Sequence, residues 1–148
     1  MSEKERFKPY VAAYLALTQN DQVLLLRRFN TGYQDGNYSL IAGRLDGGET
    51  TKQCIIREAA EEAGIQVNPE DLEVAHVAHR LTPAREYFDI YLRTEKWTGE
   101  ITNMELDKCD ELKWHDLENL PDNILPEVKL ALQSINQKIH FGEFGWEG

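Results

Sequence analysis

Hydrophobic residues recur along the chain with two periods, and these periods predict its secondary structure. Residues 10–17 and 23–26 are mostly apolar, and the turn-forming segment 18–21 separates them, a pattern typical of two buried strands joined as a hairpin. Apolar runs and alternating patterns predict further strands at 38–41, 72–79, 86–94 and 112–114. The strands at 72–79 and 86–94 are expected to form an antiparallel pair.

Two segments have the helical period instead. Thr50 followed by Gln53 forms a capping-box pattern, and Gly64 suits a helix C-terminus, so a helix is predicted over 51–63. A second helix is expected after Pro121, with Pro126 in its first turn. Its apolar stripe consists of Val128, Leu132, Ile135 and Ile139. Strands flanked by two helices predict an α/β fold in which a mixed sheet lies between helices.

The helix at 51–63 has two chemically different faces. At about 100° per residue, Glu58, Glu61 and Glu62 share one arc of about 100°. The opposite side carries the apolar residues Ile56, Ala59, Ala60 and Ala63. Like charges three and four residues apart destabilise a helix, and a cation relieves the repulsion. Clustered carboxylates suit Mg²⁺, with Mn²⁺ as an alternative, although most charge runs are simply solvated helix faces.

The spacing around this helix favours the metal-binding interpretation. The residues that matter for this spacing are Gly43, Glu49, Arg57-Glu58, aliphatic Ala59, Glu61-Glu62, Gly64 and Ile65. In this order and spacing they resemble the 23-residue box of the Nudix hydrolases, and the flanking elements from Tyr10 to Ile139 follow the order of that family. Two positions depart from it. Ala59 is smaller than the usual Leu or Val, and Ile41-Ala42-Gly43 replaces a common Pro-Gly-Gly or Pro-Ala-Gly.

The resemblance implies an α/β/α sandwich and a Mg²⁺-dependent hydrolase of phosphoric anhydride bonds. It implies that Glu58, Glu61 and Glu62 are metal ligands or, for one of them, the general base, and that Ala42 offers its backbone carbonyl. Which glutamate is the base stays open. Glu49 and Arg57 are implied to pair, which would hold the loop that begins at Gly43 against the helix; an ordinary surface ion pair is the alternative.

Further candidates lie outside the box. In the mutator-type triphosphate pyrophosphatases, a glutamate after a Trp-x-Gly-Glu segment reaches the metal, and residues 97–100 place Glu105 in that role. Glu100 and Asp107 are its rivals. Arg28 and Arg44 are candidates for phosphate contacts, with exposed arginines as the alternative.

Composition limits the possible partners. The 148 residues suffice for one domain, and 16 basic against 26 acidic residues give a net charge of −10. This sign disfavours nucleic-acid binding. There is no apolar run long enough to cross a membrane, no signal-peptide pattern and no metal-type cysteine spacing, so we expect a cytoplasmic protein. Residues 1–8 and 141–148 are expected to be loose. The possibility of a homodimer is left open.

The substrate is the least constrained prediction. In the family, the ADP-ribose and dinucleoside polyphosphate classes carry a proline or a tyrosine at set distances beyond the box, and neither Pro83 nor Tyr87 lies at the required place. The segment 97–100 and Glu105 favour a nucleoside triphosphate, cleaved to a monophosphate and pyrophosphate. A non-catalytic nucleotide sensor and an RNA end-processing enzyme are the competing functions.

Overall fold

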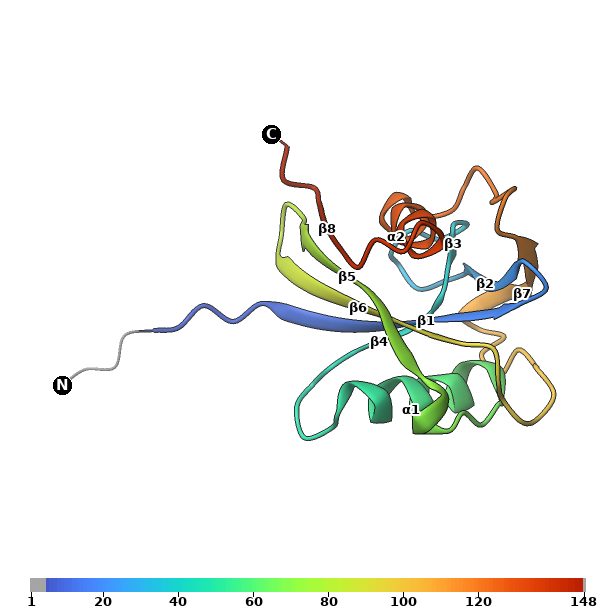
Figure 1. Ribbon diagram of the computed structural model, residues 1–148. Coiled ribbons are helices and arrows are strands. Elements are labelled where there is room, and N and C mark those ends of the chain that lie inside the picture. The colour runs from blue at the N-terminus through green and yellow to red at the C-terminus, as the bar shows by residue number, and fades with distance from the viewer. Residues whose placement is uncertain (1–4, 148) are drawn as a thin grey trace.

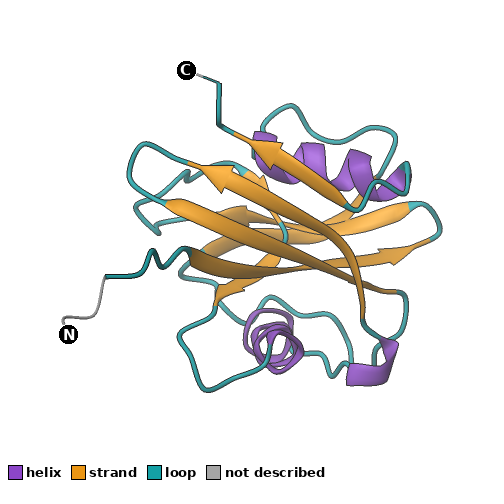
Figure 2. Cartoon of the chain, turned by 60° about the vertical axis from the view of Figure 1, so that its left-hand side comes forward, coloured by secondary structure: helices purple, strands orange, loops and turns teal. Residues whose placement is uncertain are grey.

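The computed structural model describes residues 5–147 of the chain. Eight strands form one mixed sheet, and a helix lies on each of its faces (Figures 1 and 2). The strands are β1 (Tyr10–Gln19), β2 (Gln22–Arg28), β3 (Tyr38–Ser39), β4 (Ile41–Arg44), β5 (Glu73–Leu81), β6 (Glu86–Thr94), β7 (Cys109–Asp116) and β8 (Phe141–Phe144). The helices are α1 (Thr51–Ala63), a short 3-10 turn at Pro69–Asp71, and α2 (Pro126–Asn136). This arrangement confirms the predicted fold class.

The sheet combines antiparallel and parallel pairs. Its main order is β3-β2-β1-β6-β5-β8, with β4 paired to β1 and β7 paired to β2. The predicted β1–β2 hairpin and the antiparallel β5–β6 pair are both present. The pairs β1–β6 and β5–β8 are parallel. Strand β1 therefore lies at the centre and connects the two halves of the sheet.

The alternation of β1 creates two cores, one on each face of the sheet. Ala13, Leu15 and Leu17 pack with the buried side of α1. Ala12, Tyr14 and Ala16 point the other way and pack with α2. Since successive side chains of a strand face opposite sides, one ten-residue strand supplies the middle of both layers. The sheet thus separates the α1 face from the α2 face.

Several predicted boundaries need correction. The strand expected at 38–41 is two strands, because β3 pairs with β2 whereas β4 pairs with β1. Strand β7 runs through Cys109–Asp116, well beyond the predicted 112–114, since it follows β2 over most of its length. Helix α2 ends at Asn136, so Ile139 lies beyond the helix and is exposed.

The prediction of a loose C-terminal tail is wrong for residues 141–144. These residues form β8, which adds to the outer edge of β5 in parallel. At the other end of the chain, residues 5–8 have no regular secondary structure, and residues 1–4 and 148 lie outside the described part. Within residues 5–147, no helix has the length and apolarity needed to span a membrane.

Candidate active site

Helix α1 begins and ends at the predicted residues. The Thr50 hydroxyl accepts a hydrogen bond from the Gln53 amide at 3.1 Å, and the Gln53 side chain accepts one from the Thr50 amide at 2.9 Å. Gly64 ends the helix in the left-handed conformation with φ 68°. The buried residues Cys54, Ile55, Ala59 and Ala63 pack on the sheet and set the rotation of the helix, so its carboxylates face a defined direction.

A two-pronged ion pair ties the loop before α1 to the helix. Arg57 donates from Nε and Nη2 to the two carboxylate oxygens of Glu49, at 2.9 and 3.0 Å. The same guanidinium lies 3.3 Å from Glu61 and 3.5 Å from Glu58. This contact lowers the pKa of Glu49, chiefly through the hydrogen bonds from Arg57. The pairing that the resemblance implied is therefore present in the structure.

Strand β4 lies against the acidic face of α1. A Cβ atom at Gly43 would overlap the carboxylate of Glu58, so only glycine allows this approach. The backbone of Ala42 offers a hydrogen bond that lowers the pKa of Glu62, although larger effects raise it overall. Ala42 and Gly43 thus lie next to the two glutamates with which the resemblance groups them.

Glu58 and Glu62 occupy an environment that disfavours their negative charge. Burial is the main cause of the raised pKa of both groups, to about 7 for Glu58 and about 9 for Glu62. The neighbouring charges of Glu58 and Glu105 raise the pKa of Glu62 further. Moreover, Oε2 of Glu62 is buried and has no hydrogen-bond partner among the described residues. Glu61, by contrast, has a half-exposed side chain (52%).

Glu105 reaches this cluster from the loop between β6 and β7. That loop is hydrogen-bonded to the end of α1, through Met104 N to Glu62 O and Thr102 N to Ala63 O. The Glu105 amide donates to the side chain of Asn103 at 3.0 Å. The Glu105 charge acts on both Glu58 and Glu62. Its rivals Glu100 and Asp107 are exposed.

These residues fit a divalent cation. A buried carboxylate oxygen without a donor, next to further carboxylates that repel it, is stabilised by a positive ion with oxygen preference. Among residues 5–147, no three acidic, histidine or cysteine side chains already stand in a metal-binding arrangement.

The two candidates for phosphate contacts, Arg28 and Arg44, make their contacts with residues other than the clustered carboxylates. Arg28 donates to Tyr33 O at 2.7 Å and to Thr31 Oγ1 at 3.1 Å, so its guanidinium holds the loop after β2. Arg44 lies over the ring of Tyr10, 4.9 Å from its centre, and is half exposed. Both arginines remain candidates only for a substrate that extends beyond the carboxylate cluster.

A buried charged group on the α2 face was missed by the sequence analysis. Arg80 donates to both carboxylate oxygens of Asp89, at 2.5 and 3.2 Å, and lies 3.6 Å from Glu127. It also stacks over the ring of Tyr87. The sequence signal that could have indicated this pair is a charged residue at a buried position in each of two neighbouring strands, Arg80 in β5 and Asp89 in β6. On the same face, the ring of Tyr14 stacks on that of Tyr91 with their centres 4.5 Å apart.

Comparison with protein families identifies the domain. Residues 7–135 match the model described as the NUDIX domain. NAD-capped RNA hydrolase NudC of Pseudomonas aeruginosa is 30% identical over 105 residues, which are 71% of this chain and 35% of that protein. The corresponding protein of Pseudomonas entomophila is 32% identical over 107 residues, with 71% and 36% covered. The chain thus spans about a third of the length of these relatives.

Solved structures show the same fold. MutT NUDIX hydrolase from Burkholderia pseudomallei superposes with a TM-score of 0.78 at 23% identity, covering 86% of this chain and 98% of that one. MutT protein from Methanosarcina mazei gives a TM-score of 0.75 at 18% identity, covering 90% and 98%. The family match, together with the helix, loop and carboxylates described above, shows that the chain belongs to the NUDIX family of hydrolases.

Proposed function

We propose that this protein is a Mg²⁺-dependent pyrophosphohydrolase, with Mn²⁺ as an alternative ion, that cleaves a nucleoside diphosphate linked to another group. The observation that carries the proposal is the buried oxygen of Glu62 without a partner, beside Glu58 and Glu105. The preferred substrate is a nucleoside triphosphate. Water adds to an internal phosphorus, the bond to the bridging oxygen breaks, and a nucleoside monophosphate and pyrophosphate leave.

The proposed ligands are the Ala42 carbonyl and the carboxylates of Glu58, Glu61, Glu62 and Glu105. When bound, a divalent ion would neutralise phosphoryl charge and make a bound water more acidic. One of the helix carboxylates accepts the proton of the attacking water, and the choice among them stays open. Glu49 and Arg57 keep the loop and helix together, so that the carbonyl and the carboxylates converge. The several carboxylates titrate as a coupled set.

The decisive variant is Glu62→Gln, which keeps the side-chain size and removes its charge. Turnover is expected to fall at least about a hundredfold, since the cluster loses its most buried carboxylate. Glu70→Gln is the matched control, because Glu70 is exposed on the 3-10 turn after the helix. Wild-type turnover in Glu62→Gln, or in excess chelator, would overturn the proposal. Thermal shifts with nucleotides in the absence of any product would instead favour the non-catalytic sensor.

A substrate panel tests the preference for triphosphates. It contains nucleoside triphosphates, ADP-ribose, a dinucleoside polyphosphate and NAD, with separate readouts for phosphate and pyrophosphate. A NAD-capped oligonucleotide belongs in the panel because the NudC relatives are named for that substrate. The acidic chain is expected to cleave it less well than a triphosphate. If kcat/KM is higher for any other substrate than for every triphosphate, the triphosphate assignment is wrong and hydrolysis itself still stands.

A further inference from the structure

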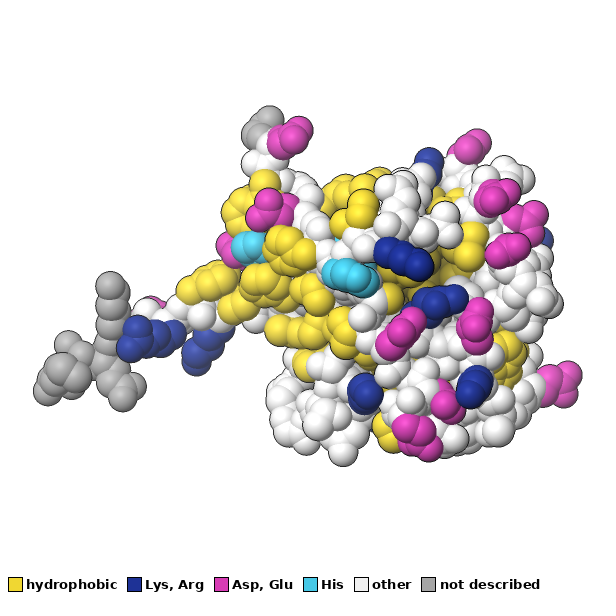
Figure 3. All heavy atoms as spheres, viewed as in Figure 1, with side chains coloured by type: hydrophobic (Ala, Val, Ile, Leu, Met, Phe, Trp, Pro, Cys, Tyr) yellow, Lys and Arg dark blue, Asp and Glu magenta, His cyan; other side chains and the backbone are white. Residues whose placement is uncertain are grey.

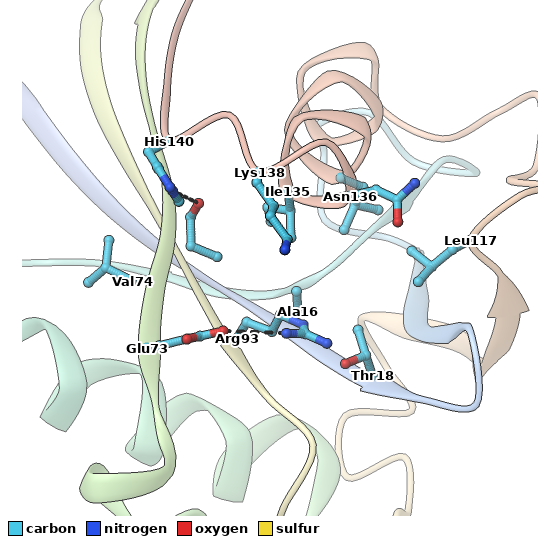
Figure 4. A pocket seen from close by; sticks show the side chains of 12 residues that line it. Ala16, Thr18, Glu73, Val74, Arg93, Leu117, Ile135, Asn136, Lys138 and His140 are labelled. Carbon is cyan, nitrogen blue, oxygen red and sulfur yellow. Dashed lines mark hydrogen bonds and ion pairs between the residues drawn. The ribbon is translucent and has the colours of Figure 1, made fainter.

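A cavity of about 400 Å³ lies on the α2 face of the sheet, opposite the face that carries α1 (Figures 1 and 4). It is bounded by the end of β1, the start of β5, the end of β6 and the last turn of α2. Ala16, Leu132 and Ile135 give it an apolar wall. A volume of this size accommodates a small organic molecule, and a mostly apolar wall with few polar groups is typical of ligand pockets.

One polar group in this cavity has no partner. Thr18 is only 6% exposed, and its Oγ1 makes no hydrogen bond to the described residues. Figure 4 shows this hydroxyl directed toward the space next to Arg93. Burying a hydroxyl without a hydrogen-bond partner costs free energy, so nearly all buried hydroxyls have a partner in the protein, a water or a ligand. Thr18 therefore provides a hydrogen-bonding position inside an otherwise apolar cavity.

Basic side chains surround the opening. Figure 3 shows two basic side chains and a histidine close together on this face, around hydrophobic atoms. Arg93, Lys138 and His140 line the cavity. Arg93 already has acidic partners, Glu73 at 3.4 Å and Glu95 at 3.2 Å. Lys138, however, makes no ion pair within the described part of the chain. An ammonium without an acidic partner beside a cavity favours an anion locally, against the net charge of −10 of the whole chain.

The backbone at Lys138 forms the C-terminal end of α2. It directly follows the last residue of the helix cap, Gln137, and has a φ of 59°, where glycine is the usual residue. The Ile139 amide donates to Ser134 O at 2.8 Å and closes the helix end. Glycine is compatible with this conformation, so Lys138→Gly can remove the side chain and keep the helix end.

We propose that this cavity is a second ligand site, separate from the carboxylate cluster, for a small organic anion. The apolar body of the ligand packs on Ala16, Leu132 and Ile135. Its anionic head group, a carboxylate, phosphate or sulfonate, pairs with Lys138. A polar atom of the body forms a hydrogen bond with Thr18. The site does not depend on hydrolysis, because its residues lie on the face of the sheet opposite α1.

Binding is measured on the full chain in excess chelator, so that the outcome is independent of the proposed reaction. The probe is 1-anilinonaphthalene-8-sulfonate, which combines an aromatic body with an anionic group and fluoresces in apolar surroundings. One molecule is expected to bind per chain. In two-dimensional ¹⁵N NMR, the affected amides should belong to the ends of β1, β6 and α2. Displacement by benzoate and by phenyl phosphate then distinguishes the two natural head groups.

Variants separate the proposed site from non-specific binding. Lys138→Gln and Lys138→Gly should each raise the Kd of the probe about tenfold, which is the effect of losing one charge-assisted contact. Lys138→Gly keeps the backbone conformation of the cap, so it also controls for folding. Thr18→Val should weaken binding severalfold. Lys129→Gln is the matched control, since Lys129 is exposed on α2 and lies outside the cavity.

Four results would contradict the inference. The first is equal affinity of the probe for wild type and both Lys138 variants. The second is amide shifts confined to α1 and β4, which would place the probe at the carboxylate cluster. The third is the absence of saturable binding by the probe, benzoate and phenyl phosphate alike, which would leave Thr18 to an ordered water. Inorganic phosphate that binds as tightly as phenyl phosphate would contradict the role of the apolar wall.

Discussion

Arg57 holds both carboxylate oxygens of Glu49 through two parallel hydrogen bonds, and it does so from the residue next to Glu58. The loop and the acidic helix are therefore fixed to each other at one point. Arg57→Lys keeps the charge but loses the two-pronged geometry. We expect activity to fall about 10- to 100-fold, with little change in unfolding by urea. Glu49→Gln should give a similar loss, and wild-type turnover in both variants would show an ordinary surface pair.

Gly43 limits what can be placed next to Glu58. Gly43→Ala introduces a Cβ where the Glu58 carboxylate lies, so that carboxylate must turn away. We expect kcat to fall about 10- to 100-fold while the fold persists. The double variant Gly43→Ala/Glu58→Gln provides the check. Its activity should be close to that of Glu58→Gln alone, because both changes act through the same side chain. Additive losses would point to a separate role for the glycine.

Glu105 influences the helix carboxylates even without a metal. Its charge raises the pKa of both Glu58 and Glu62. Glu105→Gln should therefore lower both pKa values in the metal-free protein, measured by carboxyl ¹³C NMR titration. It should also raise the Mg²⁺ concentration needed for half-maximal turnover. Asp107→Asn, on the same loop but exposed, should change neither quantity. Unchanged titrations in Glu105→Gln together with an effect of Asp107→Asn would reverse the assignment.

His115 makes the stability of the protein depend on pH. Burial lowers its pKa below the ordinary value of 6.5, and the charge of Lys113 lowers it further, although Glu111 opposes them. The unfolded chain thus takes up a proton at a higher pH than the folded chain. The contribution of His115 to the free energy of unfolding is fully present above about pH 6.5 and is lost as pH drops below it, whereas the raised pKa values of Glu58 and Glu62 change the stability in the opposite direction. The difference in the free energy of unfolding between wild type and His115→Gln, measured in urea titrations, should therefore change as pH drops below about 6.5, and a difference that stays constant with pH would show that His115 makes no such contribution.

Arg80 and Asp89 form a buried ion pair, so removing one partner leaves the charge of the other without compensation. Asp89 is fully buried and Arg80 is 6% exposed. Arg80→Leu should destabilise the protein by about 3–5 kcal/mol, because it leaves the carboxylate uncompensated. Arg80→Leu/Asp89→Leu should recover a large part of this loss. Arg85→Leu is the control, because Arg85 is exposed in the turn between β5 and β6. A loss confined to about 1 kcal/mol would mean that water reaches Asp89 in the variant.

The features that the sequence predicted well depend on local chemistry. Thr50, Gln53 and Gly64 define the ends of α1 within the helix itself, so no tertiary contact is needed to place them. The apolar run at 10–17 likewise predicts a buried strand, and β1 is buried over most of its length. The acidic arc of α1 followed from the helical period alone.

Other features depend on partners that are remote in sequence. The carboxylate arc gave no sign that Glu62 is far more buried than Glu61, because a loop with no periodic pattern covers it. Arg28 was a reasonable phosphate candidate, yet its donors go to Thr31 and Tyr33 in a loop whose shape the sequence does not specify. The Arg80–Asp89 pair is recognisable only when the register of β5 and β6 is known.

Strand β8 has a practical consequence for handling this protein. It covers the outer edge of β5, whose backbone donors and acceptors would otherwise be available to another chain. Shortening the protein before Phe141 would therefore turn a protected border into a template for intermolecular strand pairing. Such a truncated chain should associate with itself at concentrations where the full chain stays dispersed. An affinity tag that displaces residues 141–144 carries the same risk, whereas residues 5–8 lie outside the sheet.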